Sequence, residues 1–109
     1  MKRVKRRYLA LQVDSDATPN GREFIDAVWN SVTRLYGEYG ASLTGLALID
    51  YNLERKTAIL RCSLVSLGLV RVSIAAITSV ANSEAAVHVL AVSGTIKALC
   101  KKTRQLRTS

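Results

Sequence analysis

The sequence predicts an α+β fold of the ferredoxin-like split βαβ type, with the element order β-α-β-β-α-β. Two observations lead to this class. Four short stretches alternate apolar and polar residues, as strands do, and two longer stretches repeat apolar residues every three or four positions, as helices do. In this fold a four-stranded antiparallel sheet carries both helices on one face and leaves the opposite face open. An extra helix is expected at the C-terminus.

The first half of the chain predicts a strand, a helix and a second strand. Residues 7–13 alternate, and the turn-forming residues 14–21 include the only proline, so the first strand ends there. Residues 21–36 carry one wide apolar stripe and are expected to be helical. Gly37 or Gly40 can end this helix in the left-handed conformation. Residues 43–51 form the second strand.

The second half predicts a hairpin, a buried helix, a last strand and a short final helix. Residues 52–56 connect the second strand to a third over residues 57–63. Residues 65–80 are nearly apolar, but Arg71 near their middle would cost about 2.5–3.5 kcal/mol in a bilayer, so a buried helix is expected. Residues 86–92 form the fourth strand, and Ser93 is expected to cap a helix over residues 94–101. The inward face of the buried helix is expected to consist of Leu67, Val70, Ile74 and Ile77.

Charge divides the 109 residues into one α/β sandwich domain over residues 7–101, a basic N-terminal arm over residues 1–6 and a basic C-terminal tail over residues 102–109. The net charge is +8, and ten of the sixteen basic residues lie before residue 8 or after residue 96. The six other bases and all eight acids leave residues 8–96 at −2. Basic residues gathered at both ends favour a polyanionic partner. The tail is expected to be unfolded without that partner.

Residues suited to catalysis or metal binding are few. His88 is the only histidine and lies within a predicted strand, and Cys62 and Cys100 are too few for a disulfide framework or a zinc site. The acids form no pair that spacing would bring together, and the phosphate-loop and dinucleotide glycine patterns are absent. We therefore expect no catalytic residue, metal or cofactor in this chain. The basic start resembles neither a secretory signal nor a membrane anchor, so the cytoplasm is the expected compartment.

Two short segments are candidates for contact with an anion. Within residues 57–63, Arg61 lies on the strand face opposite Ala58, Leu60 and Cys62. It could reach solvent or a carboxylate, or it could contact RNA or another subunit from a central strand. At residues 94–97, a helix start could offer Thr95, Lys97 and free backbone N–H groups to a phosphate. The alternative there is ordinary capping by Ser93 with a solvated Lys97.

Four segments together resemble one known family. They are RYLAL at residues 7–11, RLYGEYGAS at residues 34–42, ILRCS at residues 59–63 and VSGTIKAL at residues 92–99. In order and spacing they resemble the archaeal ribonuclease P protein component 2 family, and the resemblance covers about residues 7–101. It departs from the family at residues 65–70, VSLGLV, where relatives tend to carry charged residues. This apolar segment fits a covered protein interface.

The resemblance implies a protein subunit that is not itself catalytic. Such a subunit binds and supports the catalytic domain of the ribonuclease P RNA, which removes the 5′ leader from precursor tRNA and is expected to use Mg²⁺. Contact with precursor tRNA would be indirect. The implied protein partner is the barrel-shaped component 3, in a dimer of such pairs, away from any membrane.

From this resemblance we assign two sets of residues. Those expected to bind RNA are Lys2, Arg3, Lys5, Arg6, Arg7, Arg61, Thr95, Lys97, Lys101, Lys102 and Arg104. Those expected to contact protein are Tyr36, Tyr39, Leu46, Leu48, Leu67 and Leu69. A general RNA-binding adaptor outside ribonuclease P is the main alternative. A small-molecule regulatory domain is less favoured, because it has no need of two basic arms.

Overall fold

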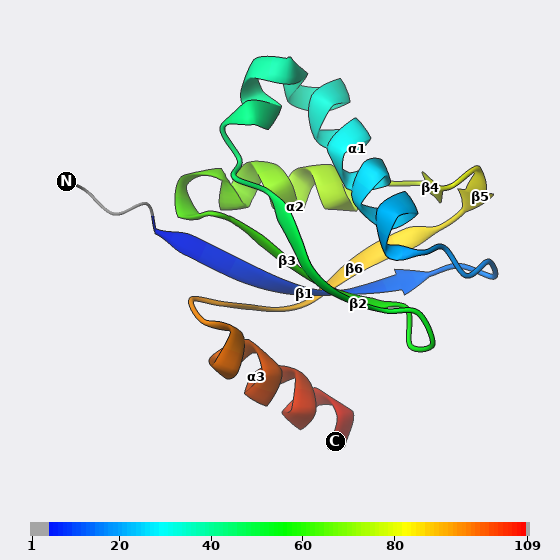
Figure 1. Ribbon diagram of the computed structural model, residues 1–109, viewed down its shortest axis with the longest axis vertical. Coiled ribbons are helices and arrows are strands. Elements are labelled where there is room, and N and C mark those ends of the chain that lie inside the picture. The colour runs from blue at the N-terminus through cyan, green and yellow to red at the C-terminus, as the bar shows by residue number, and fades with distance from the viewer. Residues whose placement is uncertain (1–4, 109) are drawn as a thin grey trace.

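The structure, a computed structural model, describes the backbone of residues 5–108 and the side chains of residues 5–102. Its elements, labelled in Figure 1, follow the predicted order with small additions. In chain order they are β1 (Arg6–Asp14), α1 (Gly21–Ser42), β2 (Ala47–Asn52), β3 (Thr57–Ser63), the 3₁₀ turn η1 (Leu64–Ser66), α2 (Leu67–Ala75), β4 (Ser79–Val80), β5 (Ser83–Glu84), β6 (Ala86–Ser93) and α3 (Ile96–Thr108).

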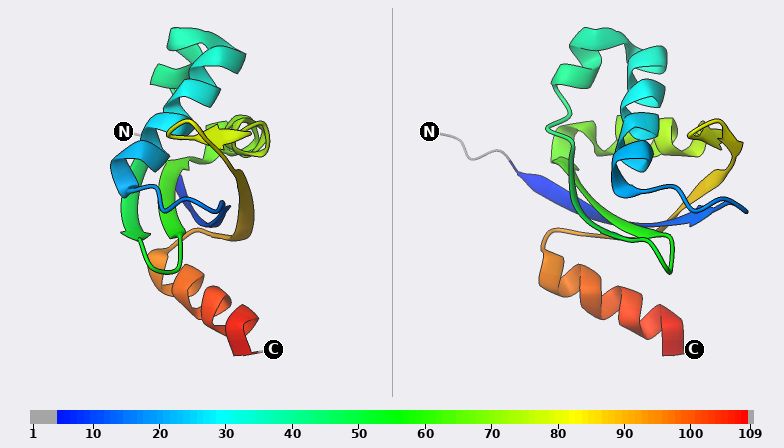
Figure 2. Two further views of the ribbon diagram at one scale, coloured as in Figure 1. Left: turned by 90° about the vertical axis from the view of Figure 1, so that its right-hand side faces the viewer. Right: turned by 45° about the vertical axis from the view of Figure 1, so that its right-hand side comes forward.

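The main sheet has four antiparallel strands in the order β2-β3-β1-β6, which confirms the split βαβ prediction. Helices α1 and α2 cover one face, as expected (Figures 1 and 2). The opposite face was expected to be open, but α3 lies across it and contacts β6 and β1. The C-terminal helix is therefore a third layer of the molecule.

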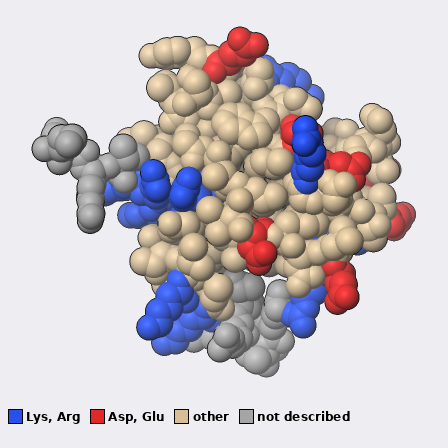
Figure 3. All heavy atoms as spheres, viewed as in Figure 1, with Lys and Arg blue, Asp and Glu red and all other residues tan. Residues whose placement is uncertain are grey.

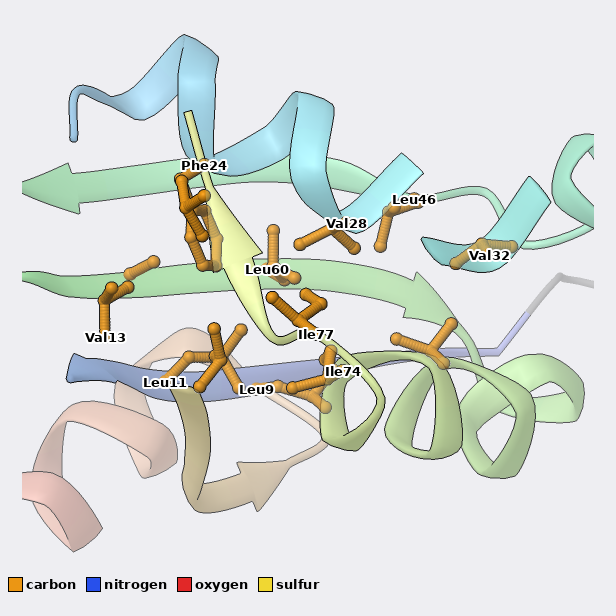
Figure 4. Close-up of a cluster of buried hydrophobic side chains, with 14 of the residues drawn as sticks. Leu9, Leu11, Val13, Phe24, Val28, Val32, Leu46, Leu60, Ile74 and Ile77 are labelled. Carbon is orange, nitrogen blue, oxygen red and sulfur yellow. The ribbon is translucent and has the colours of Figure 1, made fainter. Parts of the chain in front are cut away.

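The main core lies between the sheet and helices α1 and α2 (Figure 4). Alternation along β1 turns Leu9, Leu11 and Val13 toward it, as the pattern of residues 7–13 predicts. Helix α1 contributes Phe24, whose ring centroid lies 5.7 Å from that of Tyr51 in β2. On the other face of the sheet Ala10 of β1 and Leu99 of α3 are also buried, and Leu99 is 0% exposed. Both faces of β1 are thus covered.

The α1–β2 junction differs from the prediction. Gly37 has a positive φ of 77° but an extended ψ of 172°, so it kinks the helix without ending it, and the helix continues to Ser42. Residues 43–46 then cap the helix instead of beginning the second strand. The Thr44 hydroxyl donates to the Ala41 carbonyl at 2.8 Å, and the Leu46 N–H donates to the Thr44 hydroxyl oxygen at 3.2 Å. The strand therefore starts at Ala47.

The predicted helix over residues 65–80 is shorter in the structure. Residues 64–66 form the 3₁₀ turn, and α2 ends at Ala75. Ile77 is still buried, but it precedes a small hairpin made by β4 and β5. The hairpin turns at Ala81 and Asn82, which have φ 52° and 66°. Because both turn residues are left-handed, as this hairpin type requires, a helix cannot continue through them.

Both the predicted N-terminal arm and the predicted C-terminal tail contribute residues to regular elements of the structure. Strand β1 begins at Arg6, and the Lys5 carbonyl accepts a hydrogen bond of 2.8 Å from the Leu64 N–H, so the sheet includes part of the predicted N-terminal arm. Helix α3 runs to Thr108, whereas residues 102–109 were expected to be unfolded. Lysine, arginine, glutamine and leucine are good helix formers, so the short helix extends through the tail.

Burial predicts that stability falls in alkaline solution. Desolvation raises the pKa of the Cys62 thiol above 9.0 and, with the nearby Glu23 carboxylate, raises the pKa of the Tyr51 hydroxyl above 10.0. The unfolded chain then holds fewer protons than the folded chain at high pH, so the free energy of unfolding decreases as pH rises from about 9. Urea unfolding at a series of pH values from neutral to about pH 10 measures this slope.

A Cys62→Ala/Tyr51→Phe variant is the matched control. It is less stable at every pH, because it loses packing and the 2.6 Å hydrogen bond that the Tyr51 hydroxyl donates to the Pro19 carbonyl. Its stability should depend less on pH above 9 than that of the wild type. Equal slopes for the two proteins would show that these two groups do not set the alkaline limit.

Candidate functional site

Three segments that carry predicted RNA-binding residues meet at one end of the sheet. Tyr8 of β1 stands opposite Arg61 of β3 on one side and Ser93 of β6 on the other. The Arg7 guanidinium passes beside Gly94, since a Cβ placed on Gly94 would lie 3.5 Å from it. We call this region the basic end of the sheet and define it by Lys5, Arg6, Arg7, Arg61 and Lys97.

Charge on the surface follows this arrangement. Figure 3 shows lysine and arginine side chains gathered beside the start of β1 and over the start of α3, while most acidic side chains in this view lie away from them. No acid occurs between residues 92 and 109, so α3 adds only positive charge. The basic end is therefore suited to an extended polyanion rather than to a small acidic ligand, because its cations lie on three separate elements.

Arg61 is the most constrained residue of the basic end. It lies in β3 with Tyr8 and Ala47 as its cross-strand neighbours, on the face that α3 partly covers. The side chain is half-buried, and its Nε atom is inaccessible to solvent without a hydrogen-bond partner. A buried donor without a partner costs about 1–3 kcal/mol. Arg61 is therefore not fully solvated, because at least its Nε atom is shielded from water.

At the start of α3, Thr95 caps the helix instead of Ser93. The Thr95 hydroxyl oxygen accepts from the Ala98 N–H at 3.2 Å, and the Thr95 carbonyl accepts from the Leu99 N–H at 3.1 Å. Ser93 is buried, and its hydroxyl oxygen accepts from the Thr95 N–H at 3.5 Å. Of the two alternatives for this segment, helix capping explains the position of Thr95, although the capping residue is Thr95 and not Ser93. Lys97 is exposed and can reach an anion.

Two more basic residues of α3, Lys101 and Lys102, closely follow its buried residue Leu99 in the sequence. Lys101 is exposed, and the exposed Lys102 donates from Nζ to the Val92 carbonyl at 2.9 Å, which ties the helix to β6. The side chain of Arg104 lies outside the described residues, as do Lys2 and Arg3. The structure therefore brings together part of the predicted RNA-binding set.

The predicted protein-contact residues separate into two groups. Tyr39 is 78% exposed and Tyr36 is also exposed, at the end of α1. Leu46 is only 8% exposed and packs in the core, so it is not available to a partner in this structure. Half-buried side chains that also pack against the core are Leu48, Leu67 and Leu69.

Two further apolar side chains are exposed where α1 ends and η1 begins, and neither is among the six residues assigned above to protein contact. Val65 in η1 is 93% exposed, and Leu43 at the end of α1 is also exposed. They lie near each other because the Ser66 hydroxyl, next to Val65, donates to the Leu43 carbonyl at 3.3 Å. For Val65, the departure from the family at residues 65–70 had already suggested a covered protein interface. With Tyr36 and Tyr39, these residues form what we call the apolar end of α1.

The remaining reactive side chains do not come together. His88 is exposed on β6, Cys100 is exposed on α3, and Cys62 is buried on the other side of the sheet. Within residues 5–102, no group of three histidine, cysteine or acidic side chains is placed to hold a metal ion. No helix of the described chain has the length and apolar character needed to span a membrane.

Fold and surface together define a ferredoxin-like α+β protein with a basic sheet end. The chain belongs to the Rpp14/Pop5 family, whose model matches residues 7–104. This match confirms the resemblance seen in the four sequence segments.

Relatives from archaea and one solved structure agree with this assignment. Ribonuclease P protein component 2 of Pyrococcus furiosus is 35% identical over 100 residues, which cover 92% of this chain and 83% of that protein. The protein of the same name from Methanosarcina mazei is 31% identical, covering 94% and 87%. A chain in the cryo-EM structure of yeast ribonuclease MRP has a TM-score of 0.68 at 16% identity, covering 99% of this chain and 98% of that chain, so it shares the fold.

Replacing Arg61 by methionine should leave stability unchanged or raise it by about 1 kcal/mol. Methionine keeps most of the aliphatic stem packed and removes the buried Nε donor that has no partner. Urea unfolding measures the difference, with Arg55→Met on the exposed hairpin as the control, expected to lie within about 0.5 kcal/mol of the wild type. A loss above about 2 kcal/mol in the Arg61 variant would show that its guanidinium stabilises the fold.

Proposed function

We propose that the protein is a non-catalytic subunit of ribonuclease P, which binds the RNA component and supports its catalytic domain during removal of the 5′ leader from precursor tRNA. Family membership and relatives named ribonuclease P protein component 2 support this proposal. The observation that carries it is the basic end of the sheet, where cations from β1, β3 and α3 lie on one side of the molecule.

The chemistry of the basic end suits the backbone of a folded RNA. Arginine binds phosphate through a planar fork of donors, and the half-buried Arg61 has an Nε donor with no partner in the protein. Arg6 at the start of β1 and Lys97 in the first turn of α3 are both exposed. Contacts of this kind position a protein on RNA without reading its bases. This is what a subunit that supports a catalytic RNA requires.

In this role the RNA and its Mg²⁺ ions would hydrolyse precursor tRNA. His88 and Cys100 are exposed on different elements, and burial keeps the Cys62 thiol protonated by raising its pKa. A protonated buried thiol is a poor nucleophile. The contribution of this chain would be structural, and its contact with precursor tRNA would be indirect.

Protein partners complete the proposed assembly. We infer that the barrel-shaped component 3 pairs with this chain and that two such pairs associate, in the cytoplasm. The apolar end of α1 is the surface best suited to one of these contacts, because Tyr36, Tyr39, Leu43 and Val65 are exposed there. Aromatic residues with large exposed areas are typical anchors of protein interfaces.

Salt dependence of RNA affinity tests the basic end. If about six cations contact phosphates, log K should fall by roughly five per decade of salt. A Lys97→Gln/Lys101→Gln variant should lower the slope by about 1.4–1.8, since each contact contributes about 0.7–0.9. Substitution is preferred to truncation after Cys100, because the helix continues to Thr108. Fluorescence titrations with the RNA component at several salt concentrations measure both slopes.

Arg61→Ala should weaken RNA binding and reduce activity of the reconstituted complex while the fold is retained. The matched control is Arg55→Ala, which removes one positive charge from the exposed hairpin between β2 and β3. Both variants change net charge equally, so a difference between them reports on position. Equal affinity for RNA in the two variants would remove Arg61 from the interface.

Purification of the tagged chain from its own cells tests the whole proposal. We expect one long structured RNA and a second protein to co-purify, with the RNA identified by sequencing. A mixture of unrelated RNAs would indicate a general RNA-binding adaptor. Recovery of the protein without nucleic acid in low salt would contradict an RNA-binding role and would favour a small-molecule regulatory domain.

A further inference from the structure

The two edge strands of the main sheet, β6 and β2, differ in how well they are protected against pairing with another strand. In the order β2-β3-β1-β6, strand β6 pairs with β1 on one side, and no other strand within residues 5–108 pairs with its outer side. Its sequence, AVHVLAVS, contains no proline and no acidic or basic residue apart from His88. Edge strands are usually protected by charges, by proline or by short length. The other edge strand, β2, is shorter and includes the exposed Asp50.

The unprotected part of this edge is residues 86–89. The register between β6 and β1 shifts near Leu90, which marks a bulge and divides the strand. Beyond the bulge, Lys102 of α3 donates to the Val92 carbonyl and covers the strand there. Before the bulge, residues 86–89 pair regularly with residues 11–14 of β1. Their outward backbone groups remain available to an added strand.

A groove of about 440 Å³ runs between this segment and α2. Its floor includes Val72, which is 54% exposed, together with Ile74 and Val89. Arg71 and His88 also line it, and its lining contains no acid. A strand that added to residues 86–89 would place alternate side chains over this floor and bring its other residues near Arg71.

We propose that residues 86–89 of β6 accept an added strand from a second protein, an extended segment with an apolar side chain over the groove and an acidic side chain facing Arg71. Backbone hydrogen bonds would supply affinity, and the apolar and acidic positions would supply specificity. A second copy of this chain is a poorer occupant, because pairing two β6 edges brings two uncharged strands together with a second Arg71 and no acid. RNA is poorer still, since the groove floor is apolar. This strand-accepting surface is separate from the RNA-binding surface of the proposed function.

The test uses the full-length chain and a seven-residue peptide of alternating valine and glutamate as the probe. Amide hydrogen exchange should show new protection at residues 86–89 when the peptide is added in excess. Arg71→Glu should weaken peptide binding about fivefold, which is the upper end of what one exposed ion pair contributes. Arg55→Glu, an equal charge change on the distant hairpin, should leave peptide binding unchanged.

Control peptides separate strand addition from simple charge attraction. A peptide with proline at alternate positions, which lacks the required N–H groups, and one with lysine in place of glutamate should both bind more weakly. Equal binding of either peptide, or protection confined to the basic end, would overturn the proposal. So would protection of residues 86–89 in the free chain that depends on its concentration, because it would identify a second copy as the occupant.

The same variant separates this proposal from ribonuclease P function. Arg71 lies on α2, away from the basic end, so Arg71→Glu should bind the RNA component as the wild type does. Loss of peptide binding with intact RNA binding supports a separate strand-accepting edge. Parallel loss of both would show that the groove belongs to the RNA interface and would overturn the assignment to a protein partner.

Discussion

The rest of the structure depends on the pairing of β1 with strands on both of its sides. Leu9, Leu11 and Val13 pack under α1 and α2, while Ala10 is buried on the face that α3 covers. Because strand side chains alternate with a period of two, a slip of one residue would exchange these faces and expose the core. The same register sets Tyr8 beside Arg61 and Ser93. The register of β1 therefore fixes both the packing of the core and the position of the basic end.

This constraint explains why a strongly basic chain can fold around an ordinary core. Residues 8–96 have a net charge of −2, and the excess of positive charge lies at the two ends of the sequence. Antiparallel pairing brings those ends to the same edge of the molecule, because β1 starts where β6 finishes. Like charges gathered at one place destabilise the compact state, and an anionic partner removes that cost. Charge at the basic end is thus better suited to binding than to stability.

Local patterns predicted the parts of the fold that depend on local periodicity. Alternation located β1 and β3, and it identified the face of β3 that carries Arg61. Positions set by tertiary contacts could not be found this way: Thr44 caps α1 through bonds to Ala41 and Leu46, and α3 folds back so that Leu99 is buried against the sheet. The buried Nε of Arg61 also depends on the neighbours that the strand register supplies. Sequence named this residue as a candidate, but only the structure shows how it is constrained.

Strand β1 also determines how far apart the two proposed binding surfaces lie. The basic end lies around Tyr8 at one end of β1, whereas residues 11–14 at the other end pair with the free segment of β6. Leu11 and Asp14 lie three and six residues from Tyr8 along the strand, which is about 10 and 20 Å. RNA on the basic end would therefore leave the β6 edge open, and an added strand would leave Arg61 open. Helix α3 contributes Lys97 to the basic end, and its Lys102 is bonded to Val92 of β6, which lies beyond the bulge from the free segment. Strands β1 and β6 both run from the basic end to the free segment, so they are the direct structural connection between the two surfaces.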